Sequence, residues 1–153
     1  MEKSFEEYFN ETDGQPFNYN GKKIQLSLHL KPDNLSKYRI DNFQTKSDWK
    51  QGIVVRALKG ELHHNGTKNT AFVFWQDNFN EHIDFEYING EKLIIYNVWD
   101  TGNGVMQAGH NGAGIFIEET NDGGLIFNCN DAFPDGSMND LVFTIKKLNK
   151  NYR

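Results

Sequence analysis

Apolar residues recur at every second position in this sequence, in short runs separated by turns of asparagine, aspartate and glycine. After Lys23, for example, Ile24, Leu26, Leu28 and Leu30 alternate with polar side chains. Successive side chains of a β-strand point to opposite faces, so each run predicts a strand with one buried and one solvated face. About eight such strands without intervening helices predict an all-β fold, an antiparallel β-sandwich.

The expected strands are short and end at turn residues. Asn89-Gly90 is the strongest hairpin signal and predicts a hairpin between the strands over 83–87 and 93–99, because a type I′ turn needs positive φ at both central residues. The run over 71–75 is apolar on both faces, which predicts a strand at the centre of a sheet. The strands that the periodicity predicts cover residues 23–30, 53–58, 61–64, 71–75, 83–87, 93–99, 115–119, 125–127 and 141–145.

One helix is expected near the N-terminus, where Ser4 and Glu7 have the spacing of a capping box. A chain of 153 residues lies in the usual size range of one domain. We therefore expect a single domain, a jelly-roll or immunoglobulin-like sandwich over residues 17–148. The helix and its lead-in occupy residues 1–16, and residues 149–153 form a tail.

The charge of the chain argues against nucleic acid as a partner. It holds 16 Lys and Arg against 21 Asp and Glu, a net charge of −5, without a basic stretch interleaved with aromatic residues. Residues 1–10 lack the positive and apolar regions of a signal peptide, and no window approaches the ~20 apolar residues of a membrane span. We expect a cytoplasmic protein that binds no membrane. A single cysteine, Cys129, excludes an internal disulfide and is expected as a small buried hydrophobe.

The segment before the apolar strand LVFTI concentrates oxygen-bearing side chains. In an extended chain Asp135, Ser137 and Asn139 would point to one side, because they lie two residues apart. Asp131 and Asp140 could close around the same point from the two ends. Calcium prefers about 6–8 oxygen ligands and tolerates irregular geometry, so these five side chains predict a calcium site.

The order D-x-x-x-D-G-x-x-N-D followed by a hydrophobic strand resembles the calcium loop of small bacterial sugar-binding lectins, and a similar loop in β-sandwich domains of bacterial adhesins. The resemblance covers about the last 25 residues. It implies calcium binding and, as in the lectins, direct coordination of sugar hydroxyls. Two departures are that Ser137 stands where an acidic ligand is usual and that the chain continues through KKLNKNYR. The longer pattern YNVWDTGNG, GLIFNCND and NDLVFTI resembles uncharacterised small bacterial proteins and implies no mechanism.

A tight turn explains the same residues without a metal. Asp, Asn, Gly, Ser and Pro are the usual residues of turns. The side chains of Asp and Asn also accept hydrogen bonds from nearby backbone N–H groups. The sequence leaves both interpretations of the 131–140 segment open.

A second candidate element is the long loop 101–114, which contains five glycines. Loops of this length in a compact domain are often functional. A tryptophan beside such a loop can stack on a sugar ring or anchor a protein partner, although a core position is the default. We expect this loop and the 131–140 loop to form a binding rim at one end of the sandwich. The expected ligand-binding residues are Trp99, Asp100, Asn103, His110 and Asn111.

Two other sets of residues are of types that could support chemistry. The histidines that could ligate a transition metal are His63, His64, His82 and His110. Adjacent histidines on a strand face opposite sides, so we expect surface positions instead. The carboxylates that could include a glycosidase pair are Asp77, Asp84, Asp100, Glu118 and Glu119. Such a pair must lie ~5–9.5 Å apart across a cleft, a distance that the sequence does not supply.

Three functions follow, in order of preference. The first is a non-enzymatic binding module that holds calcium in the 131–140 loop and binds carbohydrate with the help of the 101–114 loop. The second is a protein that binds a protein partner, such as an immunity or inhibitor protein with an acidic face, because the chain is small and carries a net charge of −5. The third is a hydrolase that uses paired carboxylates.

Overall fold

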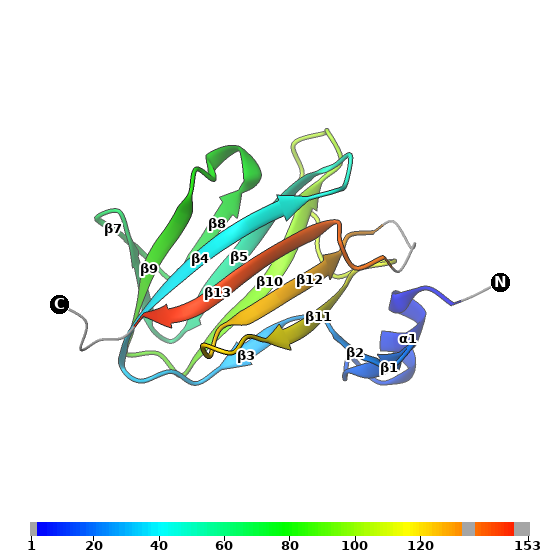
Figure 1. Cartoon of the computed structure of the whole chain (residues 1–153), viewed down its shortest axis with the longest axis horizontal. Coiled ribbons are helices and arrows are strands. Elements are labelled where there is room, and N and C mark those ends of the chain that lie inside the picture. The colour runs from blue at the N-terminus through cyan, green and yellow to red at the C-terminus, as the bar shows by residue number, and fades with distance from the viewer. Residues whose placement is uncertain (1–2, 133–136, 149–153) are drawn as a thin grey trace.

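The computed structural model describes residues 3–132 and 137–148, and strands dominate this part of the chain (Figure 1). Two antiparallel sheets share one hydrophobic core. The predicted fold class, an all-β antiparallel sandwich, is confirmed. The described residues include one α-helix, α1 (Phe5–Glu11), and one short 3-10 helix, η1 (Gln76–Asn78).

The two sheets differ in size. The larger sheet has nine strands in the order β1 (Phe17–Tyr19), β2 (Lys22–Gln25), β11 (Gly114–Glu119), β12 (Leu125–Asn130), β13 (Leu141–Leu148), β4 (Leu35–Thr45), β9 (His82–Ile88), β6 (Glu61–His64) and β7 (Thr67–Asn69). The smaller sheet has four strands in the order β3 (Leu28–Leu30), β10 (Lys92–Asp100), β5 (Lys50–Leu58) and β8 (Ala71–Trp75). Every strand pair is antiparallel.

The prediction of one strand over 23–30 is wrong, because the chain changes sheets within it. β2 pairs with β1 and β11 in the larger sheet, whereas β3 pairs with β10 in the smaller one. The amide of Gln25 donates to the carbonyl of Ser27 over 2.9 Å and holds the bend between them. An alternating pattern can thus continue through a crossover between two layers, since both layers bury the same core.

The central position predicted for 71–75 is also wrong. This strand, β8, is the last strand of the smaller sheet, and among the described residues it pairs only with β5. Phe74 is buried in the core, and Phe72 packs against it from a partly exposed position. The apolar composition of β8 therefore does not come from strands on both of its sides.

The longest strand, β4, was not predicted. Its buried positions include Ser36 and Tyr38, and they alternate with Lys37 and Arg39 on the other face. A polar residue at an inward position weakens the apolar alternation, although the period of two is kept. The structure places β4 near the middle of the larger sheet, between β13 and β9.

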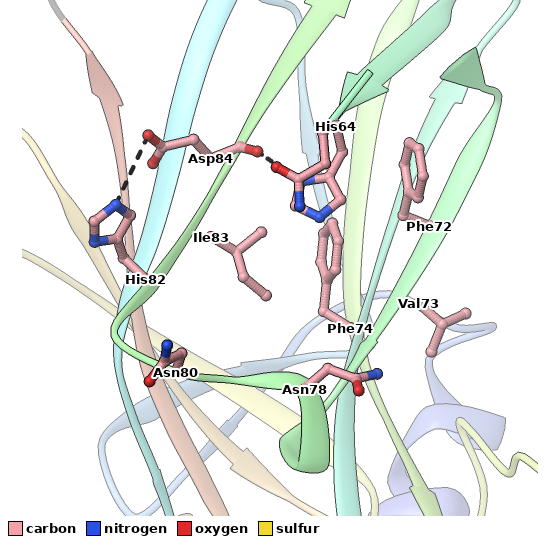
Figure 2. Close-up of a pocket in the computed structure, with 10 residues that line it drawn as sticks. His64, Phe72, Val73, Phe74, Asn78, Asn80, His82, Ile83 and Asp84 are labelled. Atoms are coloured by element: carbon pink, nitrogen blue, oxygen red, sulfur yellow. Dashed lines mark hydrogen bonds and ion pairs between the residues drawn. The ribbon is translucent and has the colours of Figure 1, made fainter. Parts of the chain in front are cut away.

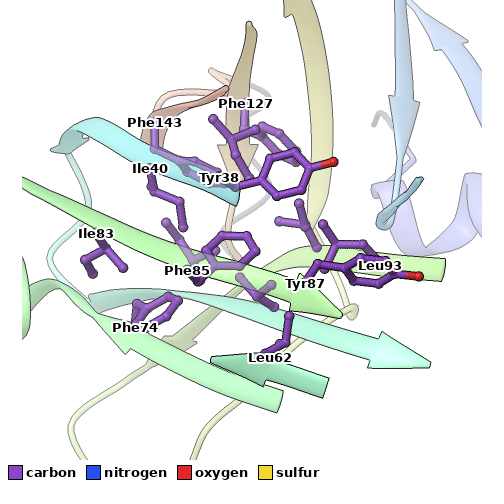
Figure 3. Close-up of a cluster of buried hydrophobic side chains, with 14 of the residues drawn as sticks. Tyr38, Ile40, Leu62, Phe74, Ile83, Phe85, Tyr87, Leu93, Phe127 and Phe143 are labelled. Carbon is purple, nitrogen blue, oxygen red and sulfur yellow. The ribbon is translucent and has the colours of Figure 1, made fainter. Parts of the chain in front are cut away.

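The main core lies between the two sheets and is rich in aromatic rings (Figure 3). Phe127 and Phe143 stack with ring centroids 4.6 Å apart, and Tyr38 stacks on Phe85 at 5.5 Å. Burying a side chain of this size stabilises a fold by about 1.5–3 kcal/mol. Cys129 is fully buried in the same core, as predicted, and burial raises the pKa of its thiol.

The predicted helix is present as α1 with its capping box. Ser4 Oγ accepts from the Glu7 backbone N–H, and a Glu7 carboxylate oxygen accepts from the Ser4 N–H over 3.1 Å. Phe5 and Phe9 are buried against Ile24 of β2, in a second cluster beside the larger sheet. The helix thus covers β1 and β2 at one end of that sheet (Figure 1).

The strand pairing brings four connections to one end of the sandwich. β5 begins where β10 ends, since Lys50 pairs with Asp100, and β13 begins where β4 ends, since Leu141 pairs with Thr45. The four connections run over residues 46–49, 76–81, 101–113 and 131–140. We call this part of the molecule the loop end, and it contains both loops that the sequence analysis singled out.

Candidate functional site

The two candidate loops contact each other at the loop end, as predicted. The Gly112 N–H donates to the Ala132 carbonyl over 3.1 Å, and the Asn130 side-chain amide donates to the Gly112 carbonyl over 3.0 Å. The helix joins this contact, because the backbone N–H of Asn111 donates to the Glu6 carboxylate over 2.6 Å. Loops far apart in sequence are therefore fixed relative to one another by direct hydrogen bonds.

Asp131 is fully buried and holds the 131–140 loop to the β4–β5 connection. Its Oδ2 atom accepts from the Ser47 hydroxyl over 2.6 Å and from the Gln51 amide over 3.1 Å. Its backbone N–H donates to the Asp140 carboxylate over 2.9 Å, and Asp140 is only 6% exposed. The bond from the Asp131 N–H to Asp140 is of the kind that a turn without a metal makes, whereas the bonds from Ser47 and Gln51 join distant segments of the chain. Sequence reasoning missed Ser47 and Gln51, because nothing local marks a partner 80 or more residues away.

The four described residues of the predicted calcium set lie in two different environments. Ser137 donates its hydroxyl to the Asn139 amide oxygen over 2.7 Å, so these two side chains lie together at the surface side of the loop. Asp131 and Asp140 are buried instead. Asp135 lies outside the described residues, so its predicted role stays a prediction. Within residues 3–132 and 137–148, no group of three or more His, Cys, Asp or Glu side chains could hold a metal ion.

Two buried polar atoms near Asp131 have no hydrogen-bond partner among the described residues. They are Oε1 of Gln51 and Nε1 of Trp99. The two residues are directly opposed in the β5–β10 ladder, so their side chains share one face of the smaller sheet. Trp99 is 0% exposed and packs with Ala113 and Ala132. It lies under the two loops and offers no ring face to a ligand.

The tip of the 101–114 loop is ordered by side-chain hydrogen bonds to its own backbone. Asp100 Oδ1 accepts from the Gly102 and Gly104 N–H groups over 2.8 and 3.1 Å, and these bonds lower the pKa of Asp100. Asn103 Oδ1 accepts from the Val105 N–H over 3.1 Å. Asp100 and Asn103, which were predicted to bind ligand, thus use their side-chain oxygens to accept hydrogen bonds from the loop's own backbone.

This ordered tip presents two apolar side chains to solvent. Val105 is 54% exposed and Met106 is 47% exposed, and with Leu35 they are the exposed large hydrophobic residues of the described chain. The tip is closed at its base by two backbone hydrogen bonds between Trp99 and Gln107, of 3.0 and 2.9 Å. Sequence analysis missed Val105 and Met106, since the glycines around them were the stronger signal.

The four candidate histidines do not gather at one site, although His64 and His82 line the same groove. His110 shares a hydrogen bond of 2.9 Å with Gln107, and its ring lies 5.3 Å from that of Trp99. His63 lies 3.4 Å from Glu61, whereas His64 points into a groove between β8 and β9. Neighbouring histidines of β6 thus face different surroundings, as the strand geometry predicts.

In the contacts of the described residues, the acidic residues proposed for a glycosidase pair bind other groups rather than facing one another. Asp84 binds Arg39 through both carboxylate oxygens, at 2.7 and 2.9 Å, and this guanidinium lowers the pKa of Asp84. The pKa of Asp100 is lowered as well. A general acid needs a raised pKa, so these shifts give the hydrolase hypothesis no support. Asp77 contacts Lys50 at 3.3 Å, and Glu118 accepts from Asn128 on the outside of β11.

Comparison of the chain with known protein families, with curated proteins and with solved structures gave no match. The function must therefore be argued from the chain's own residues. In the described part of the chain, no helix has the length and apolar character needed to cross a membrane.

Proposed function

We propose that this protein is a non-enzymatic binding module that docks a protein partner through its loop end. The observation that supports this most is the exposure of two adjacent apolar side chains, Val105 and Met106, at the tip of an ordered loop. Single exposed hydrophobic residues are common, but a pair on a projecting loop is suited to fill a pocket on a partner. The hydrogen bonds of Asp100 hold the tip in place before binding, which reduces the entropy lost on association.

Charge supports a basic partner. The whole chain has a net charge of −5, and all four connections of the loop end have acidic residues in or beside them. Asp131 and Asp140 of the fourth connection are buried, whereas Asp48 and Asp77 are exposed and Asp100 is partly exposed, with Asp77 paired to Lys50. Opposite charge on a partner would speed the encounter, and added salt would slow it. The apolar tip would then provide the contact that keeps the complex together.

The test replaces the two tip residues with aspartate, as Val105→Asp with Met106→Asp. Wild-type protein used as bait in extracts of its own cells should recover a partner, whose affinity is then measured by calorimetry with purified components. We expect the double variant to bind at least about tenfold more weakly, as for an interface hot spot.

The matched control is Leu35→Asp. Leu35 is 58% exposed and lies at the start of β4, opposite Ile88 and away from the loop end. This control should bind like the wild type. Failure to recover a partner, or equal weakening by both variants, would count against docking through the tip.

Calcium-supported carbohydrate binding is a second candidate, and the buried acids favour it. Asp131 and Asp140 are 0% and 6% exposed, and they are linked by a hydrogen bond. Burying carboxylates is costly unless they are compensated. Ser47 Oγ lies 2.6 Å from Asp131 Oδ2, and the amide group of Gln51, with its unbonded oxygen, lies beside the same carboxylate. Oxygen atoms of these kinds suit calcium.

A thermal melt of chelator-treated protein, with and without millimolar calcium, tests this candidate. A ligand at 100 times its dissociation constant adds about 2.7 kcal/mol to the native state, which raises the Tm by several degrees. We expect Asp135→Ala and Asp140→Ala to abolish the shift, and a glycan array in calcium to identify the sugar. An unchanged Tm in the wild type would leave the 131–140 loop as a turn.

A further inference from the structure

β8 has the composition of a central strand but lies at the edge of a sheet. Its sequence, AFVFW, is apolar on both faces, yet it pairs with β5 alone. Natural edge strands are usually protected by lysine, proline, a bulge or a covering segment. β8 contains neither lysine nor proline, and the register of its pairing with β5 shows no bulge.

The hydrogen-bond register shows which backbone groups of β8 point outward. The Ala57 N–H donates to the Thr70 carbonyl over 2.8 Å, so Thr70 and the residues two and four positions after it face β5. The intervening residues, including Val73, direct their N–H and C=O groups away from the sheet. Within the part of the chain that the structure describes, Val73 therefore offers one free donor and one free acceptor at the edge of the smaller sheet.

A second open edge lies in the larger sheet. β9 is paired with β4 along its whole length, but β6 pairs only with Glu86, Tyr87 and Ile88. No strand of the described residues pairs with the first half of β9 on that side. The imidazole Nδ1 of His64 lies 2.8 Å from the Asp84 carbonyl oxygen, which shows that this carbonyl points away from β4.

A groove of about 530 Å³ lies between these two edges (Figure 2). Three successive residues of β8 line it, Phe72 to Phe74, and successive residues of a strand point to opposite faces. The groove must therefore follow the backbone edge of β8 rather than one face of the sheet. The rings of Phe72 and Phe74 are parallel within 6°, and His64 packs edge-on against both.

We propose that the groove binds an extended segment of another protein, which adds as a strand to β8. The outward N–H and C=O groups of Val73 can form hydrogen bonds with the backbone of an extended chain, as those of neighbouring strands in a sheet do. Alternate side chains of the segment would point toward Phe72, Phe74 and His64, which favours apolar residues at every second position. This surface is separate from the tip of the 101–114 loop and does not depend on it.

Charge and shape further define the segment. Asp84 is neutralised by Arg39, whereas Glu81, just before β9, is exposed and makes no ion pair in the described part of the chain. Glu81 lies between Asn80 and His82, which line the groove, so a basic residue just beyond that end of the segment would complement it. Asn65 borders the groove from the β6–β7 turn, and Asn78 and Asn80 border it from the segment that precedes β9. These borders suit a single strand of about five residues, ~17 Å long, better than the edge of a second copy.

The test uses a phage-displayed library of linear peptides selected on the full-length wild-type chain. We expect enriched peptides with alternating apolar residues and a basic end. Hydrogen exchange should show that such a peptide protects the Val73 amide. Val73→Pro removes the N–H that faces the groove and leaves the bonds to β5 in place, because proline is tolerated when its missing N–H faces away from the ladder. We expect this variant to bind the peptide at least about tenfold more weakly.

Val73→Thr is the matched control, since it keeps the N–H and a β-branched side chain, and it should bind like the wild type. Each of three results would overturn the proposal. They are a selection without enriched peptides, equal binding of the peptide by Val73→Pro, and a Val73 amide that bound peptide does not protect in the wild type. A concentration-dependent dimer that Val73→Pro abolishes would also overturn it, in favour of pairing between copies. Val105→Asp with Met106→Asp should leave peptide binding unchanged, so failure here is distinguishable from failure of the loop-end proposal.

Discussion

Single side chains at the loop end act mainly on the backbone of their own molecule. Asp100 orders the tip of the 101–114 loop, and Asp131 joins two connections through Ser47 and Gln51. Oxygens that looked available for a ligand in the sequence are thus bonded within the fold. The exposed side chains of the tip include two large apolar ones, Val105 and Met106.

At the residue scale, the ion pair between Arg39 and Asp84 predicts how the stability of the fold depends on pH. The guanidinium holds the pKa of Asp84 below its ordinary value of 3.8. A carboxylate with a lowered folded-state pKa stabilises the fold above its unfolded-state pKa, and this stabilisation is lost as the pH falls through the folded-state pKa.

Asp84→Asn should therefore lower the free energy of unfolding at neutral pH by about 0.5–1 kcal/mol, a small value because the pair is partly exposed. The deficit should shrink steadily below about pH 4. Urea unfolding of the wild type and Asp84→Asn at a series of pH values measures this difference in the free energy of unfolding. A deficit that stays constant down to pH 2 would show that the ion pair is not its source.

At the scale of elements, the helix and β8 illustrate opposite relations between sequence and position. α1 follows its local signals, because the Ser4 and Glu7 capping box forms as its spacing predicts. β8 does not, since an apolar strand with the composition of a sheet centre lies at an edge beside a groove. A mismatch between composition and position is a reason to look for a partner at that position.

Removing the cap should destabilise the fold. Ser4→Ala loses the acceptor for the Glu7 N–H and is expected to cost about 1 kcal/mol. The loss should appear as a lower urea midpoint with an unchanged m-value. Glu7→Gln is the control, because glutamine keeps the return bond to the Ser4 N–H. A Ser4→Ala variant as stable as the wild type would contradict the prediction.

At the scale of the whole molecule, Cys129 reports on opening of the sandwich. It lies on β12 with 0% exposure, and burial raises the pKa of its thiol, so both access and thiolate formation are suppressed. We expect an aromatic disulfide reagent to modify native protein only as fast as the core opens, and denatured protein at once. Labelling rates that rise with urea in step with global unfolding would support this. Fast labelling of native protein would contradict it.

The sequence by itself determined the fold class, most strand positions, the capped helix and the buried cysteine, because these depend on the period of two and on local turn and capping residues. It missed β4, where Ser36 and Tyr38 occupy inward positions, and it joined β2 to β3 across a change of sheet. The hairpin predicted at Asn89-Gly90 is also wrong, because β9 and β10 on either side of this turn belong to different sheets. Only the tertiary structure decided that β8 is an edge strand, that Trp99 is covered, and that Asp131 binds Ser47 and Gln51. Each of these depends on contacts between residues far apart in the chain, which no local pattern encodes.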